Sequence, residues 1–244
     1  MHSTASALPR PMPGPLRRAL RRHALLVALV GAYALLSLVL KAVLAPGVKG
    51  EGMAAMVASF AGMLPLMLYF GLALRFLHMV RVARPADRAA WMKADLRAVV
   101  KDPDRLADTL LALGLVIATL ASFAQMKGLI TAIQPFAWDR TFAAADRALT
   151  FGYAPWQVVH ATLGHPWVIT LVTGAYNFWL SLMCFVLFYA CFARRNPVAR
   201  LQFLLAFVLA WVLGGNLLAT VFSSAGPAYF ERLGLGTDFA PLMS

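Results

Sequence analysis

Five long apolar runs constrain this chain more than any other feature of its sequence. Each run has about 20 residues or more, the length that a helix needs to cross the hydrocarbon core of a bilayer. No segment shows the alternating pattern of a β-strand. We therefore predict an all-α, polytopic membrane bundle whose five spanning helices lie at Ala24–Ala45, Met53–Val80, Leu106–Ile133, Trp167–Phe192 and Leu201–Phe222.

The overall composition favours a membrane protein over a soluble one. The chain is 61% hydrophobic and 13% charged, whereas a soluble domain averages about 45–50% apolar and about 25% charged residues. The net charge of +12 would suggest nucleic acid as a partner of a soluble protein. Here the basic residues stand between the apolar runs and form no nucleic-acid-binding motif. We expect membrane lipids as partners and no nucleic acid, and the sequence names no protein partner.

The distribution of Lys and Arg predicts the orientation in the membrane. Fifteen of the 22 basic residues lie in residues 1–22, 81–105 and 194–200. Four lie in the connections on the other side, at Lys49, Arg140, Arg147 and Arg232. The positive-inside rule then predicts a multi-pass protein of the inner (plasma) membrane, with the N-terminus in the cytoplasm and the C-terminus outside.

The segments outside the spans carry three further expectations. Residues 1–22 are expected to form a basic, disordered tail, with Leu16–His23 able to extend the first helix of the bundle at 23–244. Ala83–Arg105 is either an interfacial helix on the cytoplasmic side or a solvated linker. Trp138–Gly152 is expected to form a short helix in the outer interface, because its four charges oppose full insertion.

Few residues offer chemistry. His160 and His165 have no obvious carboxylate partner and are a weak metal signal, so we expect no metal and no cofactor. Gln125 lies within a span and is expected to bond between helices, and Gly214-Gly215 would let another helix approach closely. Cys184 and Cys191 lie two turns apart on one helix and are expected to be packing residues.

The segment after the last span has the composition of an anion site. In "SSAGPAYF", Pro227 forces the preceding residue out of helical geometry. Ser223, Ser224 and the free amides near Gly226 could then face an anionic ligand. The alternative is an ordinary helix stop.

A set of short motifs in the second half of the chain resembles a known family. The motifs "PFAWDRTFAAADRALTFGYAPWQ", "YNFWL", "FSSAGPAYF" and "FAPL" follow one another in this order. Over Pro135–Leu242 they are similar to the type 2 phosphatidic acid phosphatase superfamily, most closely its inositolphosphoceramide-synthase-like (inositol phosphotransferase) branch. The resemblance covers the N-terminal part of that catalytic domain. It implies a lipid-phosphate phosphatase or phosphotransferase that needs no metal and handles phosphorylated lipid headgroups.

Our predicted substrate-binding residues combine this resemblance with the local chemistry. Arg140 and Arg147 would bind the phosphate by charge-assisted hydrogen bonds. The remaining candidates line the same face in the family pattern, and they are Tyr176, Asn177, Ser223, Ser224, Gly226 and Pro227.

The motifs that carry catalysis in this family are not found. Neither Pro-Ser-x-His nor His-x-x-x-Asp occurs, so we assign no catalytic residue and expect the chain to be inactive alone. Truncation, frameshift and true loss remain open as causes. Two alternatives also remain open: a non-catalytic membrane protein that binds a lipid phosphate, and a small transporter or accessory subunit.

Overall fold

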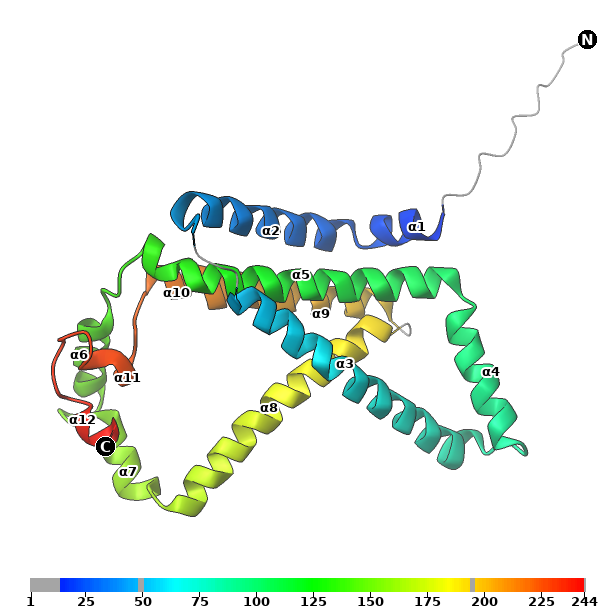
Figure 1. Ribbon diagram of the computed structural model, residues 1–244. Helices are drawn as coiled ribbons and strands as arrows, with labels where there is room; N and C mark the ends of the chain where they lie inside the picture. Colours follow the sequence, from blue (N-terminus) through cyan, green and yellow to red (C-terminus); the bar gives the residue numbers. More distant parts are fainter. Residues whose placement is uncertain (1–13, 48–50, 194–195, 244) are drawn as a thin grey trace, which may run out of the picture.

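The computed structural model describes residues 14–47, 51–193 and 196–243, and within them it contains helices, turns and no strand (Figure 1). The helices of the first half are α1 (Pro15–Arg22), α2 (Ala24–Leu44), α3 (Glu51–His78), the π-helical η1 (Met79–Ala83), α4 (Arg88–Val100) and α5 (Pro103–Ile133). Those of the second half are α6 (Asp139–Leu149), α7 (Pro155–Leu163), α8 (Pro166–Phe192), α9 (Pro197–Leu209), the π-helical η2 (Ala210–Leu218), α10 (Ala219–Val221), α11 (Pro227–Phe230) and α12 (Ala240–Met243).

Five helices are long and apolar enough to cross a membrane, which confirms the predicted all-α membrane bundle. Among the described residues they are Ala24–Leu44, Val57–Ala83, Pro103–Ile133, Pro166–Phe192 and Pro197–Val221. The last three begin at a proline. Proline suits the first position of a helix, where its missing N–H has no helical partner and its fixed φ is already helical.

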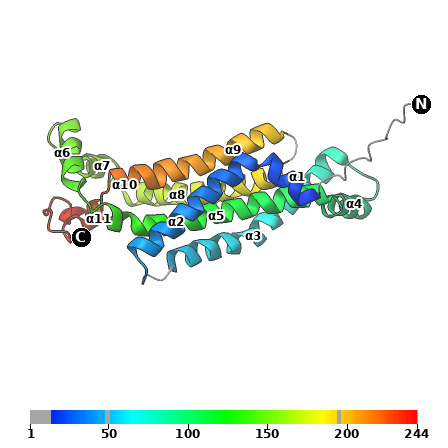
Figure 2. The same ribbon diagram turned by 90° about the horizontal axis from the view of Figure 1, so that it is seen from above.

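Helix α5 is the centre of the bundle. Helices α2 and α9 run beside it in both views, whereas α3 and α8 contact part of it and then diverge (Figure 1 and Figure 2). Its Ala112 is fully buried and Val116 is nearly so, in one core cluster with Leu26 of α2, Leu187 of α8 and Leu204 of α9. Small and β-branched side chains on α5 let the neighbouring helices pack closely, which is how helices associate in a membrane.

Two hydrogen bonds inside the bundle join α2 to its neighbours. Gln125 Nε2 donates to the backbone carbonyl of Ser37 at 2.7 Å, which confirms the predicted interhelical role of Gln125. Tyr33 Oη donates to Asn216 Oδ1 at 2.6 Å. Both pairs are buried, and a polar group in hydrocarbon needs such a partner.

The segment Gly214-Gly215 lies in η2, against α5. A Cβ atom on Gly215 would come within 2.6 Å of the Phe123 ring, so any larger residue would force that ring to move. The Phe123 ring in turn meets the edge of Trp211 at a centroid distance of 4.4 Å. The predicted close approach is therefore confirmed at Gly215.

The two ends of the bundle differ in structure. We call the end that holds α1, α4 and the start of α9 the α1 end, and the end that holds α6, α7, α11 and α12 the α6 end (Figure 1). Between them, α8 diverges from α5, and its first half is exposed in this chain.

Pro15–Arg22 are helical, in agreement with the helix expected at Leu16–His23 and not with a disordered tail over all of residues 1–22. These residues form α1, which packs on α5 with Ala19 fully buried, and α1 ends at His23 before α2 begins. The physical reason is a pair of ion pairs with the start of α5, formed by Arg18 and Arg22. Residues 1–13 lie outside the described residues.

The segment 83–105 contains a helix, which agrees with the first of the two alternatives, a helix, and not with a solvated linker. Helix α4 starts at an Asp87 side chain that accepts a hydrogen bond from the Ala90 amide. It is fixed to α3 by an ion pair between Arg75 and Asp95. An aspartate at this cap satisfies an amide that has no partner within the helix.

The connection between α5 and α8 holds two helices where the sequence predicted one. Helix α6 agrees with the expected helix at Trp138–Gly152, and it is followed by Phe151 and Gly152, which both have positive φ. The second helix, α7, begins at Pro155 and includes His160. It was missed because its nine residues carry no strong apolar period.

Candidate functional site

The predicted site at the α6 end is organised around one carboxylate. Asp139, the first residue of α6, is 4% exposed. Its Oδ1 accepts hydrogen bonds from Ser224 Oγ at 2.6 Å and from the Gly226 amide at 2.9 Å. Its Oδ2 accepts one from the Ala225 amide at 3.1 Å. We call these four residues the Asp139 clamp.

The backbone around Ser223–Gly226 explains why the loop presents its donors together. Gly226 has φ +80°, a conformation that favours glycine, and Pro227 then begins α11. The carbonyl of Ser223 accepts from the amides of Ala137 and Trp138, both at 3.2 Å. Two segments about 85 residues apart are thus joined by main-chain and side-chain hydrogen bonds.

The clamp keeps Asp139 ionised. Burial raises the pKa of this carboxyl, but the hydrogen bonds from Ser224, Gly226 and Ala225 lower it by more, and the net pKa lies below its ordinary value. The loop is therefore an anion cradle, and the anion within it is a side chain of the same protein. The sequence predicted an external anionic ligand here, and that stays a prediction. Ser224 and the Gly226 amide are already engaged in this structure.

The two predicted arginines have different surroundings. Arg140 follows Asp139 on α6, is exposed, and has no ion pair within the described part of the chain. Arg147 Nη2 lies 2.5 Å from Asp238 Oδ2, which fixes the end of α6 to the segment after α11. Arg140 is consequently an exposed cation next to the clamp and is accessible to a ligand.

The other predicted residues do not converge on the clamp. Ser223 is fully buried, and within the described residues its Oγ has no hydrogen-bond partner. Tyr176 and Asn177 are exposed on the diverging part of α8. Asn177 Nδ2 donates to the Thr173 carbonyl of its own helix at 2.9 Å. Both residues lie on α8, whereas Asp139 lies on α6.

The histidines of this end are separated by secondary structure. His160 lies in α7 beside the Trp156 ring, and His165 is the residue before α8. The described residues contain no group of three His, Cys, Asp or Glu side chains that could hold a metal ion.

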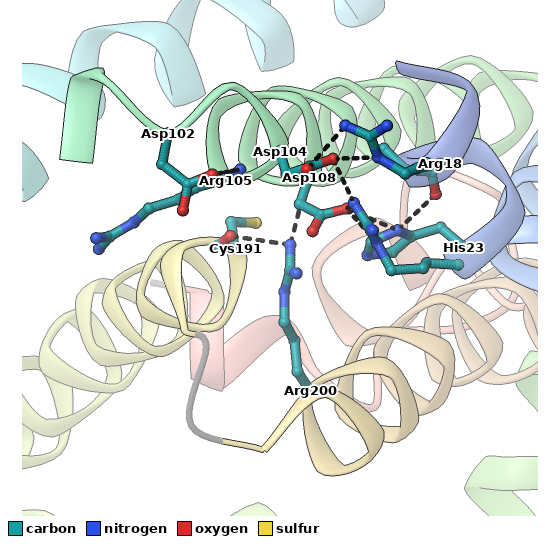
Figure 3. A network of polar contacts seen from close by, with 10 residues as sticks. Arg18, His23, Asp102, Asp104, Arg105, Asp108, Cys191 and Arg200 are labelled. Atoms are coloured by element: carbon teal, nitrogen blue, oxygen red, sulfur yellow. Dashed lines mark hydrogen bonds and ion pairs between the residues drawn. The ribbon is translucent and has the colours of Figure 1, made fainter. Parts of the chain in front are cut away.

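A cavity at the α1 end was missed by sequence reasoning. Its volume is about 330 Å³, and its charged lining consists of Arg22, Arg105, Arg200, Asp104 and Asp108. It lies where α1, the start of α5, the end of α8 and the start of α9 meet (Figure 3). We call it the arginine cavity.

The carboxylates of the arginine cavity are held by α1. Arg18 donates to both oxygens of Asp104, each at 2.9 Å. Arg22 donates to Asp108 Oδ1 at 3.1 and 3.0 Å. His23 Nδ1 lies 3.7 Å from the same oxygen. The two arginines and the two aspartates each stand four residues apart, and this matched spacing was the signal available in the sequence.

Arg200 differs from these paired arginines. It is half-buried at the start of α9 and donates to three main-chain carbonyls, each at 3.0 Å: those of Ala190, Cys191 and Asp108. The described residues place no carboxylate oxygen within ion-pair distance of it. Its guanidinium is held by main-chain carbonyls of α8 and α5, and the Asp108 carboxylate attracts it electrostatically without coming within ion-pair distance.

Comparison with known proteins gives no further assignment. No protein-family model, curated protein or solved structure matches the chain. Its function is therefore inferred from the geometry of its two ends.

Proposed function

We propose that this protein is a membrane scaffold of the lipid-phosphate phosphatase or phosphotransferase type, which binds a phosphorylated lipid headgroup at its α6 end without cleaving it. One observation carries the proposal. The Trp-Asp motif and the Ser-Ser-Ala-Gly-Pro motif, which together gave the resemblance, form one hydrogen-bonded unit around Asp139. Two short motifs that meet in space support the resemblance better than either motif alone.

The proposed ligand contact is Arg140 at the edge of this unit. The Asp139 clamp fixes the first turn of α6, so the backbone of Arg140 is held at a defined position. A guanidinium can bind a phosphate through two parallel charge-assisted hydrogen bonds. Arg147 would contribute only after leaving Asp238.

We propose that the chain alone does not hydrolyse or transfer the phosphate, because neither histidine motif of the family occurs in the sequence. We also propose the orientation expected from the basic residues, with the α1 end in the cytoplasm and the α6 end outside. Alkaline phosphatase fused after residue 95 and after residue 243 tests this orientation. Activity only in the first fusion would refute it.

Binding is tested with the purified full chain and phosphatidic acid in phosphatidylcholine nanodiscs. We expect Arg140→Ala to weaken binding about tenfold or more, since a hydrogen bond to a charged group contributes about 1.5–3 kcal/mol. Arg232→Ala is the matched control, because Arg232 is another exposed arginine of this end, stacked on Tyr229.

The same samples are assayed for phosphate release. Equal binding by wild type and Arg140→Ala would refute the proposed site. Release of phosphate by the wild type that vanadate inhibits would refute the proposed lack of turnover.

A further inference from the structure

We propose that the arginine cavity binds the phosphate group of an anionic phospholipid at the α1 end. This site lies at the opposite end of the bundle from the Asp139 clamp and does not depend on the function proposed above. The volume of the cavity is about 330 Å³. Small-molecule sites typically have volumes of about 300–1,000 Å³.

The position of the cavity favours a lipid. It lies between the first turns of α5 and α9 and the last turn of α8, and these are three of the helices that can cross a membrane. The ends of spanning helices stand at the level of the lipid headgroups. Phe192 and Pro197 also line the cavity and provide apolar surface beside the charged groups.

The charge of the cavity favours an anion. Its lining has three arginines and two aspartates. Both aspartates accept hydrogen bonds from arginines of α1, namely Arg18 and Arg22. Arg200 remains without an ion pair within the described residues although it is half-buried. A partly desolvated cation of this kind is stabilised by an anion that enters beside it.

The helix ends add to the positive electrostatic potential of the cavity. Helices α5 and α9 both begin at the cavity, and the N-terminal end of a helix carries partial positive charge. Their cap residues, Asp102 and Asn196, each satisfy one amide, of Arg105 and Ala199 respectively. Basic pockets between spanning helices are a known form of anionic headgroup site.

Two variants separate this cavity from diffuse attraction to a basic surface. Arg200→Gln removes the unpaired charge. Ala193→Trp keeps every charge and fills the space, because Ala193 lines the cavity at the end of α8. Arg97→Gln is the control, because Arg97 is an exposed arginine on α4 at the same end but outside the cavity.

The full chain is placed in phosphatidylcholine nanodiscs with added phosphatidylglycerol, and retained phosphatidylglycerol is counted by native mass spectrometry. We expect Arg200→Gln and Ala193→Trp to weaken retention about tenfold, and Arg97→Gln to leave it unchanged. Wild-type retention by the Ala193→Trp protein, or an equal loss in Arg97→Gln, would overturn the proposal.

Two measurements on the wild type do not depend on how the variants fold. A photoactivatable phosphatidylglycerol should label peptides that contain residues 103–109 and 190–200, and labelling confined to other peptides would overturn the proposal. Glycerol 3-phosphate then distinguishes the source of the phosphate. Displacement of the lipid means that the phosphate group suffices, and the absence of displacement means that the cavity recognises the intact lipid.

Discussion

Replacing one carboxylate oxygen of Asp139 by an amide nitrogen, in Asp139→Asn, should strongly weaken the clamp. In Asp139→Asn the side chain keeps its shape, but only one oxygen remains to accept hydrogen bonds. If that oxygen faces Ser224 and Gly226, the new amide group faces the Ala225 N–H, so one donor meets another. The variant also loses the charge that strengthens the other two hydrogen bonds.

The magnitude follows from these three contacts. A hydrogen bond to a charged group contributes about 1.5–3 kcal/mol, and an unsatisfied buried donor costs about 1–3 kcal/mol. The full effect applies because Asp139 is 4% exposed. We expect the free energy of opening the clamp to fall by about 3 kcal/mol, which is roughly a hundredfold increase in the open fraction.

Ser223 is a suitable reporter of this opening. It is fully buried beside the clamp, and its Oγ has no hydrogen-bond partner in the described chain, so Ser223→Cys changes little. The native Cys184 and Cys191 are first replaced by alanine. The rate at which an impermeant thiol reagent modifies Cys at position 223 should rise about a hundredfold in Asp139→Asn.

Asp146→Asn is the matched control for this experiment. Asp146 lies on the same helix and is exposed. An unchanged rate in Asp139→Asn, or a similar rise in both variants, would show that the carboxylate does not hold the loop.

Two further predictions concern pH and the interior of the bundle. Because the folded pKa of Asp139 is depressed, its stabilisation is present above the ordinary carboxyl pKa of about 3.9 and is lost as pH falls through the lower folded value. The fluorescence of Trp138, taken as the difference from Trp138→Phe, should be constant from about pH 8 to 5 and change only below about 4; a transition near neutral pH would contradict this. Tyr33→Phe removes the donor to the buried Asn216 Oδ1 and should destabilise the bundle by about 1 kcal/mol. A thermal unfolding midpoint equal to that of the wild type would refute it.

The spanning helices could be predicted because their signal is local. A run such as Pro166–Phe192 carries its hydropathy within itself, and a bilayer fixes the necessary length. The interhelical bond of Gln125 was predictable for a similar reason, since a polar side chain within a span requires a partner.

The partners within each end could not be predicted in the same way. Asp139 and Gly226 are far apart in sequence, and nothing local shows that the loop binds a carboxylate of its own chain. The sequence predicted Ser224 and Gly226 as groups that bind an anionic ligand, and in this structure they bind the Asp139 carboxylate. Arg18 and Arg22 were assigned to a tail, because their aspartates belong to a helix that begins about 80 residues later.

The π-helical segment η2 gives the last span an unusual sensitivity to length. Its nine residues lie between α9 and α10 and carry Asn216 toward Tyr33. In a regular α-helix each residue is rotated by about 100° about the helix axis, and a π turn holds more residues than an α turn. Removing one residue from the π turn can therefore restore α-helical geometry there. A deletion elsewhere in the span has no such turn to absorb it and would rotate everything that follows, including the loop that holds Asp139. Insertions and deletions outside η2 should therefore be felt at the far end of the molecule, whereas a substitution at the same position need not be.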